Sequence, residues 1–269
     1  MTDLSVITVS HGHEKEVKRL LQSIKEKDWK VSFEIILVDN LPPHRAAKIA
    51  RKIYPEVRIL KNLRPKGFAH NVNLGVNYSK GRFIFLLNPD IIVLNGLFDN
   101  VVKFMDNHPD VGIAAPKLLN LDGTRQVSAR KFPNLPVMIF RGLGLDKIFY
   151  NFKLNKDYEL RSLDSKNGYI PVDWVVGAAM VLRRQAIDEV GKFDEKRFHL
   201  YFEDVDMCYR MWKAGWKVVY LTDVSSIHEW KRRSAKNLFS IYKFHHVVSG
   251  LKFFKKYRLN LKNPREGKR

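Results

Sequence analysis

The first 120 residues alternate between short apolar runs and longer segments whose apolar residues recur every three or four positions. The short runs predict strands at residues 4–10, 33–40, 57–62 and 81–90. The segments between and after them predict helices at residues 15–27, 44–54, 69–80 and 97–108. Because the strands are apolar almost throughout and alternate with helices, the pattern indicates an α/β fold: a mostly parallel central sheet with helices on both faces.

The second half of the chain is less regular at first and then returns to the same pattern. Residues 121–170 contain several Pro, Gly and basic residues and predict a long excursion over a cleft. Strands are expected at 172–184 and 216–229, with a short helix at 185–193 and an acidic turn leading into a helix at 198–215. We therefore expect one domain over residues 1–230, divided near residue 120 into two halves.

Residues 231–269 form a basic extension. They carry thirteen Lys or Arg and a single acid, Glu266, out of a formal net charge of +20 for the chain. An apolar stripe at helical spacing runs through Leu238, Ile241, Phe244 or His245, Val248, Leu251 and Phe254. This predicts an amphipathic basic helix, for which two interpretations stay open and are compatible: the stripe packs on the domain, or the helix lies on an anionic membrane surface.

Composition excludes several classes of protein. One cysteine, Cys208, rules out an internal disulfide framework and a Cys-based zinc site, and it suits a reducing compartment. The start of the chain does not look like a signal peptide, and the longest apolar stretch, residues 83–94, is interrupted by Asn88, Pro89 and Asp90. We expect a cytoplasmic protein that is soluble or peripheral at the inner membrane face. A nucleic-acid-binding protein is an alternative for this charge, but the cations gather at the terminus while acids follow the strands.

Polar side chains follow three of the predicted strands. Ser10 ends the first strand, Asp39 and Asn40 end the second, and Asn88 and Asp90 follow the fourth. The carboxyl ends of parallel strands share one edge of a sheet, where such folds bind ligands. Since no Gly-rich phosphate loop follows the first strand, neither a dinucleotide-binding nor a P-loop protein is expected, and a nucleotidyltransferase is disfavoured.

Each candidate residue has a structural alternative. Asn88 and Asp90 are oxygen ligands suited to Mg²⁺ or Mn²⁺, or they form a turn. Asp39 can bind a nucleobase or ribose, or cap the next helix. His228, at the end of a strand, can be structural or a metal ligand.

The run Glu203–Asp204–Val205–Asp206 opens a helix and is equally ambiguous on its own. Its carboxylates can complement the helix dipole, or hold a general base beside a metal-bound phosphate. Together, in this order on an α/β chain, the four signals indicate a site for a nucleotide, its diphosphate and a metal.

These motifs resemble the family-2 inverting glycosyltransferases of the GT-A fold, particularly the bacterial rhamnosyltransferase-like branch. The likeness rests on residues 4–10 with 33–40, on GFAHNVNLGV at 67–76, on LLNPD ending at Asp90, on DGTRQVSARKFP at 122–133, and on the long segment 176–216 with its Glu-Asp pair. YKFHHVVSGLKFFKKY at 242–257 looks like the closing helix of this branch. Asn88 stands in place of the first acid of the family's metal motif.

The resemblance implies that residues 1–230 are the catalytic domain, with a nucleotide-binding half at 1–120 and an acceptor and catalytic half at 121–230. It also implies a role for each matching residue. Asp204, paired with Glu203, is the implied catalytic base, and Asp90 and His228 are the implied ligands of Mg²⁺ or Mn²⁺. The donor nucleotide and its diphosphate are assigned to Thr8, Ser10, Asp39, Asn40, Gly67, Phe68, Asn73, Asn88, Arg232 and Arg233. The acceptor is assigned to Arg130, Trp174 and Gly177. Arg125, Arg130, Lys131 and Arg141 are cations that either meet the diphosphate of the acceptor or form a solvated surface.

The implied activity is transfer of a sugar, with inversion, from a nucleoside diphosphate donor to a hydroxyl group. The donor suggested first is dTDP-L-rhamnose, with galactofuranosyl or hexosaminyl transfer as alternatives. The implied acceptor is a saccharide or a polyprenyl-diphosphate-linked saccharide in surface polysaccharide synthesis. If this assignment is right, Asp90, Asp204 and His228 must converge, although they lie far apart along the chain.

Overall fold

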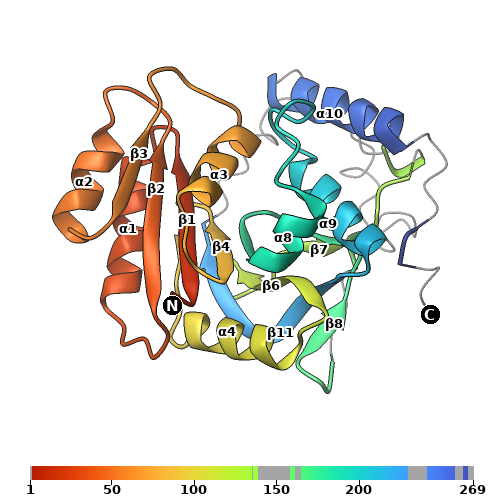
Figure 1. Cartoon of the computed structure of the whole chain (residues 1–269), viewed down its shortest axis with the longest axis horizontal. Helices are drawn as coiled ribbons and strands as arrows, with labels where there is room; N and C mark the ends of the chain where they lie inside the picture. Colours follow the sequence, from red (N-terminus) through yellow and green to blue (C-terminus); the bar gives the residue numbers. More distant parts are fainter. Residues whose placement is uncertain are drawn as a thin grey trace.

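The computed structural model describes residues 2–134, 136–138, 158–160, 165–229, 241–257 and 263–265, and the predicted alternation of strands and helices is present in it (Figure 1). The strands are β1 (Leu4–Ser10), β2 (Phe33–Asp39), β3 (Arg58–Lys61), β4 (Phe83–Leu87), β5 (Ile91–Ile92), β6 (Val111–Leu119), β7 (Ala129–Arg130), β8 (Tyr169–Pro171), β9 (Trp174–Val175), β10 (Ala179–Arg183) and β11 (Lys217–His228). The helices are α1 (Glu14–Lys25), α2 (Arg45–Ile53), α3 (Phe68–Asn77), α4 (Leu97–Asn107), α8 (Arg184–Val190), α9 (Glu203–Ala214) and α10 (Ile241–Tyr257).

The central sheet is mostly parallel, as the sequence predicts. Its strand order is β3-β2-β1-β4-β10-β6-β11-β5, with β8 paired to β11. The first four strands run parallel, β10 is antiparallel to its neighbours β4 and β6, and β11 is parallel to β6. The strands β1, β2, β3 and β4 therefore end at one edge, and β6 and β11 end on the same side, whereas β5 runs antiparallel to β11.

Helices cover both faces of this sheet. One apolar cluster joins Val6 and Leu37 to α1, α2 and α4, and another joins Ile7 and Ile36 to α3, α8 and α9. Neighbouring residues of a strand point to opposite faces, so a strand that is apolar throughout fills both clusters. The prediction of two covered faces is confirmed.

The sequence pattern did not identify β6, although β6 lies between β10 and β11. Its residues include Gly112, Ala114, Ala115 and Pro116, which have weak intrinsic preference for strands. Ala114 and Ala115 are nevertheless buried in the sheet. Burial on both faces outweighs local propensity at this position.

The C-terminal helix α10 packs on α9 and on the segment before it through only part of the predicted stripe, since Phe254 is buried and Val248 is half-buried. Phe253 and Phe254 are buried, whereas Phe244 is 65% exposed and Leu251 is 60% exposed. The contact face is centred on small residues, and a side chain at Gly250 would collide with Met138. Close approach therefore decides which face of the helix is buried. No helix in the described ranges is long and apolar enough to cross a membrane.

Candidate active site

Polar residues from four strands meet at the carboxyl edge of the sheet. Ser10 and Asp39 are paired in register as the last residues of β1 and β2. Asn88 directly follows β4, and His228 ends β11. The topology thus gathers residues separated by more than 200 positions in the sequence.

Asp90 and His228 face each other at this edge. The distance between His228 Nε2 and Asp90 Oδ1 is 3.3 Å, and the backbone amide of Glu229 donates to the Asp90 carbonyl at 2.9 Å. Burial raises the pKa of the Asp90 carboxyl, but the neighbouring His228 outweighs burial and lowers it below its usual range. Asp90 is therefore a carboxylate at neutral pH.

This pair fits a divalent cation that takes two protein ligands. Ligands in adjacent octahedral positions, with bonds of about 2.1 Å, lie about 3 Å apart, close to the separation of Asp90 and His228. Within the described ranges no group of three His, Cys, Asp or Glu side chains could hold a metal. Two protein ligands leave the other positions to water and phosphate oxygens, which is how Mg²⁺ usually binds at phosphate-handling sites.

The Glu203–Asp204 pair opens α9 at the end of a strained turn. Tyr201 and Phe202, immediately before it, both have φ of 68°, in the left-handed region. Asp204 Oδ2 accepts a hydrogen bond from the Gly177 amide at 3.0 Å, and Oδ1 accepts one from the Val205 amide at 2.8 Å. Glu203 Oε2 is buried and makes no hydrogen bond in the part of the chain that the structure describes.

The surroundings of the two carboxyl groups affect their pKa values differently. Burial raises the pKa of Glu203 to about 8, and Asp204 beside it adds to the rise. Burial also raises the pKa of Asp204, but the Gly177 and Val205 amides and the cation of Arg130 oppose that effect. The two carboxyl groups interact and titrate as a pair, and the charged form of Asp204 is the one stabilised by hydrogen bonds from two backbone amides and by a nearby cation.

Asp204 is linked to the Asp90 side of the edge through two residues of one loop. Gly177 holds Asp204, and the carbonyl of the next residue, Ala178, accepts a hydrogen bond from the Asn88 amide at 2.8 Å. Asn88 in turn lies two residues from Asp90. The structure therefore brings Asp204 to the same edge as Asp90 and His228.

Two of the residues assigned to the acceptor lie against each other beside Asp204. The guanidinium of Arg130 lies over the Trp174 ring, 5.1 Å from its centroid. Trp174 is fixed in turn by its indole N–H, which donates to the Lys131 carbonyl at 2.7 Å. β7 and β9, which carry Arg130 and Trp174, pair in register at these residues. A cation and an apolar ring thus border the carboxylate.

On the donor side, Asp39 caps the next helix. Its Oδ2 accepts from the Ala47 amide, in the first turn of α2, at 2.8 Å, and its Oδ1 is 3.7 Å from His44 Nδ1. Ser10 Oγ accepts from the His13 amide at 3.2 Å, which shapes the turn into α1. Thr8 Oγ1 is buried without a hydrogen bond among the described residues.

Asn40 and Asn73 were assigned to the donor, but their side chains are occupied within the protein. Asn40 Oδ1 accepts from Asn62 Nδ2 and from the Lys66 amide, each at 2.8 Å, and its Nδ2 donates to the Lys66 carbonyl. Asn73 bonds both backbone groups of Phe193 and the carboxylate of Glu195. Both amides hold loops in place: the Asn40 oxygen accepts two hydrogen bonds, and the Asn73 oxygen accepts one and keeps one lone pair.

Gly67 and Phe68 also contact another part of the protein, at His199. The Phe68 amide donates to the His199 carbonyl at 2.9 Å, and a β-carbon at Gly67 would lie 2.6 Å from atoms of His199. Glycine is required here because the backbone of the segment before α9 approaches so closely. These residues tie the donor half to the segment that leads to Glu203.

Sequence reasoning missed the residues that support the site. Gln126 contacts His228, and Asp206 binds Arg210, Lys256 and Tyr257 instead of joining Asp204. Polar residues inside an apolar pattern are the one signal for such buried groups, and that signal does not reveal their partners. Arg232, Arg233 and Arg141 lie outside the described residues.

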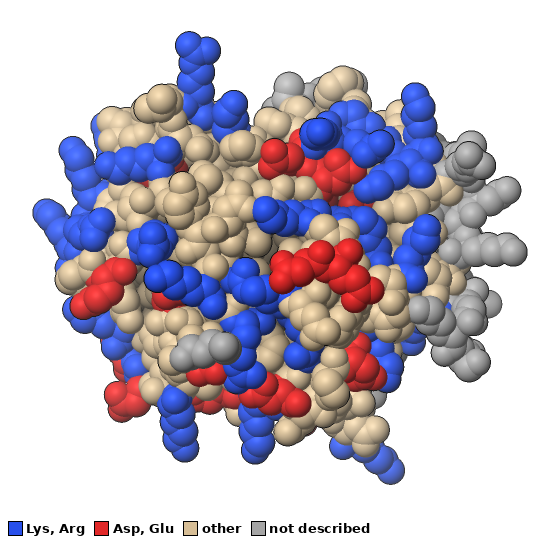
Figure 2. All heavy atoms as spheres, in the orientation of Figure 1, with Lys and Arg blue, Asp and Glu red and all other residues tan. Residues whose placement is uncertain are grey.

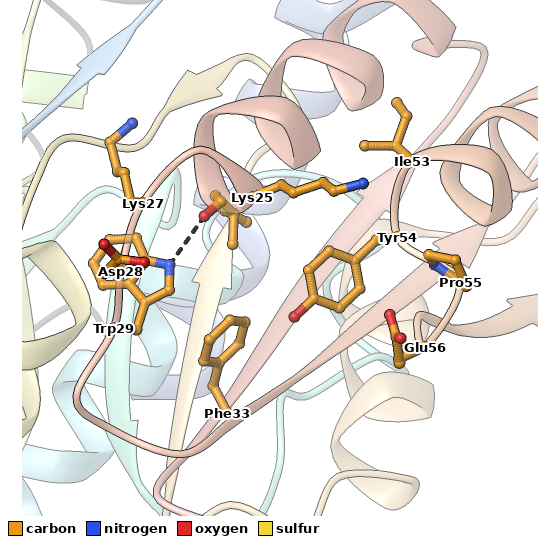
Figure 3. Close-up of a pocket in the computed structure, with 10 residues that line it drawn as sticks. Lys25, Lys27, Asp28, Trp29, Phe33, Ile53, Tyr54, Pro55 and Glu56 are labelled. Carbon is orange, nitrogen blue, oxygen red and sulfur yellow. Dashed lines mark hydrogen bonds between the residues drawn. The ribbon is translucent and has the colours of Figure 1, made fainter.

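A surface pocket elsewhere on the molecule is unrelated to this chemistry. Figure 3 shows Trp29, Phe33 and Tyr54 lining it, with the Trp29 indole donating to the Ile24 carbonyl at 3.0 Å. Phe33 begins β2 and Asp39 ends it, so the pocket lies at the opposite edge, about 20 Å from Asp39 along the strand.

Comparison with known proteins gives a family and a set of relatives. The sequence profile described as "Glycosyl transferase family 2" matches residues 5–191, and "Glycosyl transferase family group 2" matches residues 145–244. The chain is 28% identical over 262 residues to the N-acetylglucosaminyl-diphospho-decaprenol L-rhamnosyltransferase of Mycobacterium tuberculosis, covering 91% of this chain and 82% of the relative. It is 28% identical over 267 residues to the rhamnosyltransferase WbbL of Escherichia coli, covering 94% and 93%.

Solved structures agree on the fold. The mannosyltransferase PcManGT from Pyrobaculum calidifontis, in complex with GDP-Man and Mn²⁺, superposes with a TM-score of 0.64 at 18% identity, covering 95% of this chain and 64% of that chain. GalNAc-T7 with UDP, GalNAc and Mn²⁺ superposes with a TM-score of 0.62 at 17% identity, covering 85% and 44%. The chain therefore spans less than two thirds of either solved protein.

Proposed function

The chain belongs to glycosyl transferase family 2, and from this membership we propose that it transfers L-rhamnose from dTDP-L-rhamnose to a hydroxyl group of a lipid-linked saccharide, in surface polysaccharide synthesis. The relatives named rhamnosyltransferases, which align over more than nine tenths of this chain, support the choice of sugar. The observation that carries the proposal is Asp204, held by the Gly177 amide and linked through Ala178 and Asn88 to the edge bearing Asp90 and His228.

In this reaction Asp204 is the general base. Its carboxylate takes the proton of the acceptor hydroxyl while the hydroxyl oxygen bonds to the anomeric carbon of the donor. The bond between that carbon and the diphosphate oxygen breaks on the opposite side, and the configuration inverts. The two amides that orient Asp204 keep its charged form available, while burial keeps it basic enough to accept the proton.

The diphosphate leaves with negative charge that must be stabilised. Asp90 and His228 would hold Mg²⁺ or Mn²⁺, which supplies Lewis-acid stabilisation of that charge when bound. Solved neighbours of this fold contain Mn²⁺ with a nucleotide or nucleotide-sugar, which supports the assignment of a divalent metal and a nucleotide-sugar donor. We assign Arg232 and Arg233 a second, electrostatic contribution to the same charge.

For the donor nucleotide we assign Asp39 to the pyrimidine base. Its Oδ2 is committed to α2, so Oδ1, 3.7 Å from His44, is the atom proposed to contact the base. Thr8, Ser10 and Asn88 line the same carboxyl edge. Asn40, Gly67 and Phe68 are proposed to shape the donor site through the contacts that hold its loops, and Asn73 to anchor α3 to the backbone of Phe193.

For the acceptor we propose a polyprenyl-diphosphate-linked saccharide. The M. tuberculosis relative is named for such a lipid-linked sugar, N-acetylglucosaminyl-diphospho-decaprenol. Arg130, held over the buried Trp174 ring beside Asp204, offers a cation for phosphate, and we assign Trp174 the role of positioning it. Gly177 completes this wall of the site.

A lipid-linked acceptor requires contact with a membrane, and we propose that α10 supplies it from the cytoplasmic side. Phe244, Val247 and Leu251 lie on one face of the helix and are 65%, 41% and 60% exposed. Figure 2 shows Lys and Arg side chains gathered over this part of the molecule, and Lys252 and Lys255 of α10 are exposed. An apolar stripe beside cations matches an anionic lipid surface.

Thermal shifts of the full chain with nucleotide-sugars test the donor. We expect dTDP-L-rhamnose with Mn²⁺ to raise the melting temperature, UDP- and GDP-sugars to have less effect, and chelation to remove most of the shift. Formation of a rhamnosylated product from the lipid-linked acceptor then tests the reaction. A larger shift with UDP-galactofuranose or a UDP-hexosamine, together with transfer of that sugar, would reassign the donor.

Vesicle sedimentation tests the membrane contact. The double variant F244S/L251S should bind vesicles containing anionic lipid at least several-fold more weakly than the unmodified chain. The matched control, L63S/L121S, removes two exposed apolar side chains, 92% and 68% exposed, from other regions. Equal loss of binding in both variants would contradict the assignment to α10.

A further inference from the structure

Gln126 joins the segment before β7 to the end of β11. Its side chain is buried, with 6% exposed, and its Oε1 is 2.8 Å from His228 Nδ1. Its Nε2 donates to the His228 carbonyl at 2.7 Å and to Asn120 Oδ1 at 2.8 Å. One glutamine therefore touches both the backbone and the ring of His228.

The direction of these hydrogen bonds is set by groups that can only accept. The carboxylate of Asp122 accepts from the Thr124 hydroxyl, and the Thr124 oxygen accepts from Asn120 Nδ2 at 2.9 Å. Asn120 must then present its oxygen to Gln126. The His228 carbonyl, which has no proton to give, requires the same orientation of the Gln126 amide. Two independent acceptors thus place Nε2 of Gln126, and Oε1 is left for the imidazole.

From this polarity we infer that Gln126 is a positioning residue: it holds the proton of the neutral His228 ring on Nδ1 and turns the lone pair of Nε2 toward Asp90. The inference rests on the proposed function in one respect, since it assigns Nε2 as the atom of His228 that meets the metal. A histidine ligand whose other nitrogen donates to a fixed acceptor is held in one tautomer and one ring orientation.

The contact distances favour this tautomer over the other. With the proton on Nε2, the lone pair of Nδ1 would face the Gln126 oxygen at 2.8 Å, and that oxygen cannot turn away. With the proton on Nδ1 of a neutral ring, the two acceptors that face each other are Nε2 and Asp90 Oδ1, at the longer distance of 3.3 Å. This contact becomes attractive when the ring takes a second proton on Nε2 or when a cation binds between the two atoms. Asp90 is also partly exposed, so water can solvate its oxygen. Two acceptors directed at one point make a ready position for a cation.

Nitrogen NMR on the metal-free protein tests the inference directly. Long-range ¹H–¹⁵N spectra of the chelator-treated full chain, at a pH where the ring is neutral, should show His228 protonated on Nδ1 and bare on Nε2. In Gln126→Met, which keeps the length of the side chain but removes the acceptor, we expect the Nε2–H form to become the main species. Gln126→Glu keeps an acceptor facing Nδ1 and should retain the Nδ1–H form, although its second oxygen cannot replace the hydrogen bonds that Nε2 donates to the His228 carbonyl and to Asn120.

Binding of Mn²⁺ alone gives a second readout that needs no turnover. Free Mn²⁺ measured by EPR should show about 10–100-fold weaker binding to Gln126→Met, and binding to Gln126→Glu within a few-fold of the unmodified chain. The control Gln185→Met changes an exposed glutamine on α8 and should alter neither readout.

A neutral His228 protonated on Nε2 in the unmodified chain would overturn the inference, as would an unchanged tautomer and Mn²⁺ affinity in Gln126→Met. If Gln126→Met fails to fold, the spectra of the unmodified chain and Gln126→Glu decide alone. Failure of the proposed function looks different: the tautomer and Mn²⁺ results would stand while no nucleotide-sugar binds and no product forms.

Discussion

The donor edge of the sheet and the N-terminus of α9 both bury polar side chains, but they satisfy them to different degrees. At the donor edge, the amides of Asn40 and Asn73 bond to backbone groups and neighbouring side chains through both oxygen and nitrogen. At α9, Glu203 keeps a buried oxygen with no hydrogen bond in the described ranges, and Asp204 receives only backbone amides. The side-chain amides of the first region are hydrogen-bonded within the protein, whereas the carboxyl groups of the second region keep oxygens that can still accept a proton.

The difference teaches where the molecule places its stability and its reactivity. Saturated amide networks in a low-dielectric interior rigidify the loops that they join. An unpartnered buried carboxyl destabilises the fold, and its affinity for protons rises for the same reason. The strained backbone at Tyr201 and Phe202, directly before Glu203, likewise destabilises the fold locally, as is common at functional sites.

The largest effect is expected from removing the base. Asp204→Asn keeps an oxygen for the Gly177 amide but cannot accept the proton, so transfer should slow by about 10²–10⁴-fold. Steady-state transfer assays measure the rate, and thermal shifts with the donor check that donor binding persists. The control Asp188→Asn changes an exposed carboxylate on α8 and should leave the rate unchanged. Full activity in Asp204→Asn would remove Asp204 from the mechanism.

The next effect concerns the pH dependence of stability. Because burial raises the pKa of Glu203 from an ordinary 4.5 to about 8, the folded state keeps a proton that the unfolded state loses. Stability therefore falls as pH rises from about 4.5 to 8. Glu203→Gln removes this loss. The unfolding free energy of the variant, relative to that of the unmodified chain, should therefore rise by roughly 2–4 kcal/mol between pH 5 and pH 8.

Urea unfolding at a series of pH values measures this gain. The control Glu26→Gln replaces an exposed glutamate and should show no such dependence. A constant difference between Glu203→Gln and the unmodified chain across the series would mean that Glu203 is ionised in the folded protein at pH 5.

On the donor side, the comparison predicts a loss of stability without a change in donor affinity. Asn73→Ala leaves the buried amide and carbonyl of Phe193 without their partner, which should cost about 2–3 kcal/mol. The matched control, Asn77→Ala, removes an exposed amide from the same helix. Urea unfolding measures the loss, and calorimetric titration of the folded variant with dTDP should give an affinity within a few-fold of the original. A selective loss of dTDP affinity in Asn73→Ala would show that Asn73 contacts the donor directly.

Much of this arrangement was accessible from the sequence, for a physical reason. Periodicity locates where strands end, and a parallel sheet brings those ends to one edge, so Asp39, Asp90 and His228 could be placed near one another before the structure was known. The partners of buried amides could not be predicted in this way. Gln126 meets His228 across 102 positions, and nothing local in the sequence signals that contact.

The errors in the sequence-based fold have a common origin in packing. β6 has weak strand propensity, yet it is buried between two strands. The contact face of α10 follows the close approach permitted at Gly250, so Phe254 of the predicted apolar stripe is buried while Phe244 and Leu251 stay exposed. Local preference fails in both places because neighbours that are distant in sequence decide burial.

The smallest effect is expected at Asp206, the third carboxylate of α9. Like the amides of the donor edge, and unlike Glu203 and Asp204 among the described residues, it is buried and hydrogen-bonded to other side chains. Asp206 is fully buried but satisfied, with Lys256 at 2.6 Å, Tyr257 at 2.8 Å and Arg210 at 2.9 Å. Tyr257→Phe removes one of these donors and leaves both cations, so it should cost about 1 kcal/mol of unfolding free energy. The control Tyr78→Phe, at a side chain that is 50% exposed, should cost nearly nothing. Transfer rates of both variants should match the unmodified chain, because Asp206 anchors α10 and does not face the substrate. A rate loss in Tyr257→Phe alone would show that α10 also positions Asp204. The structural and the reactive carboxylates of α9 would then not be independent of each other.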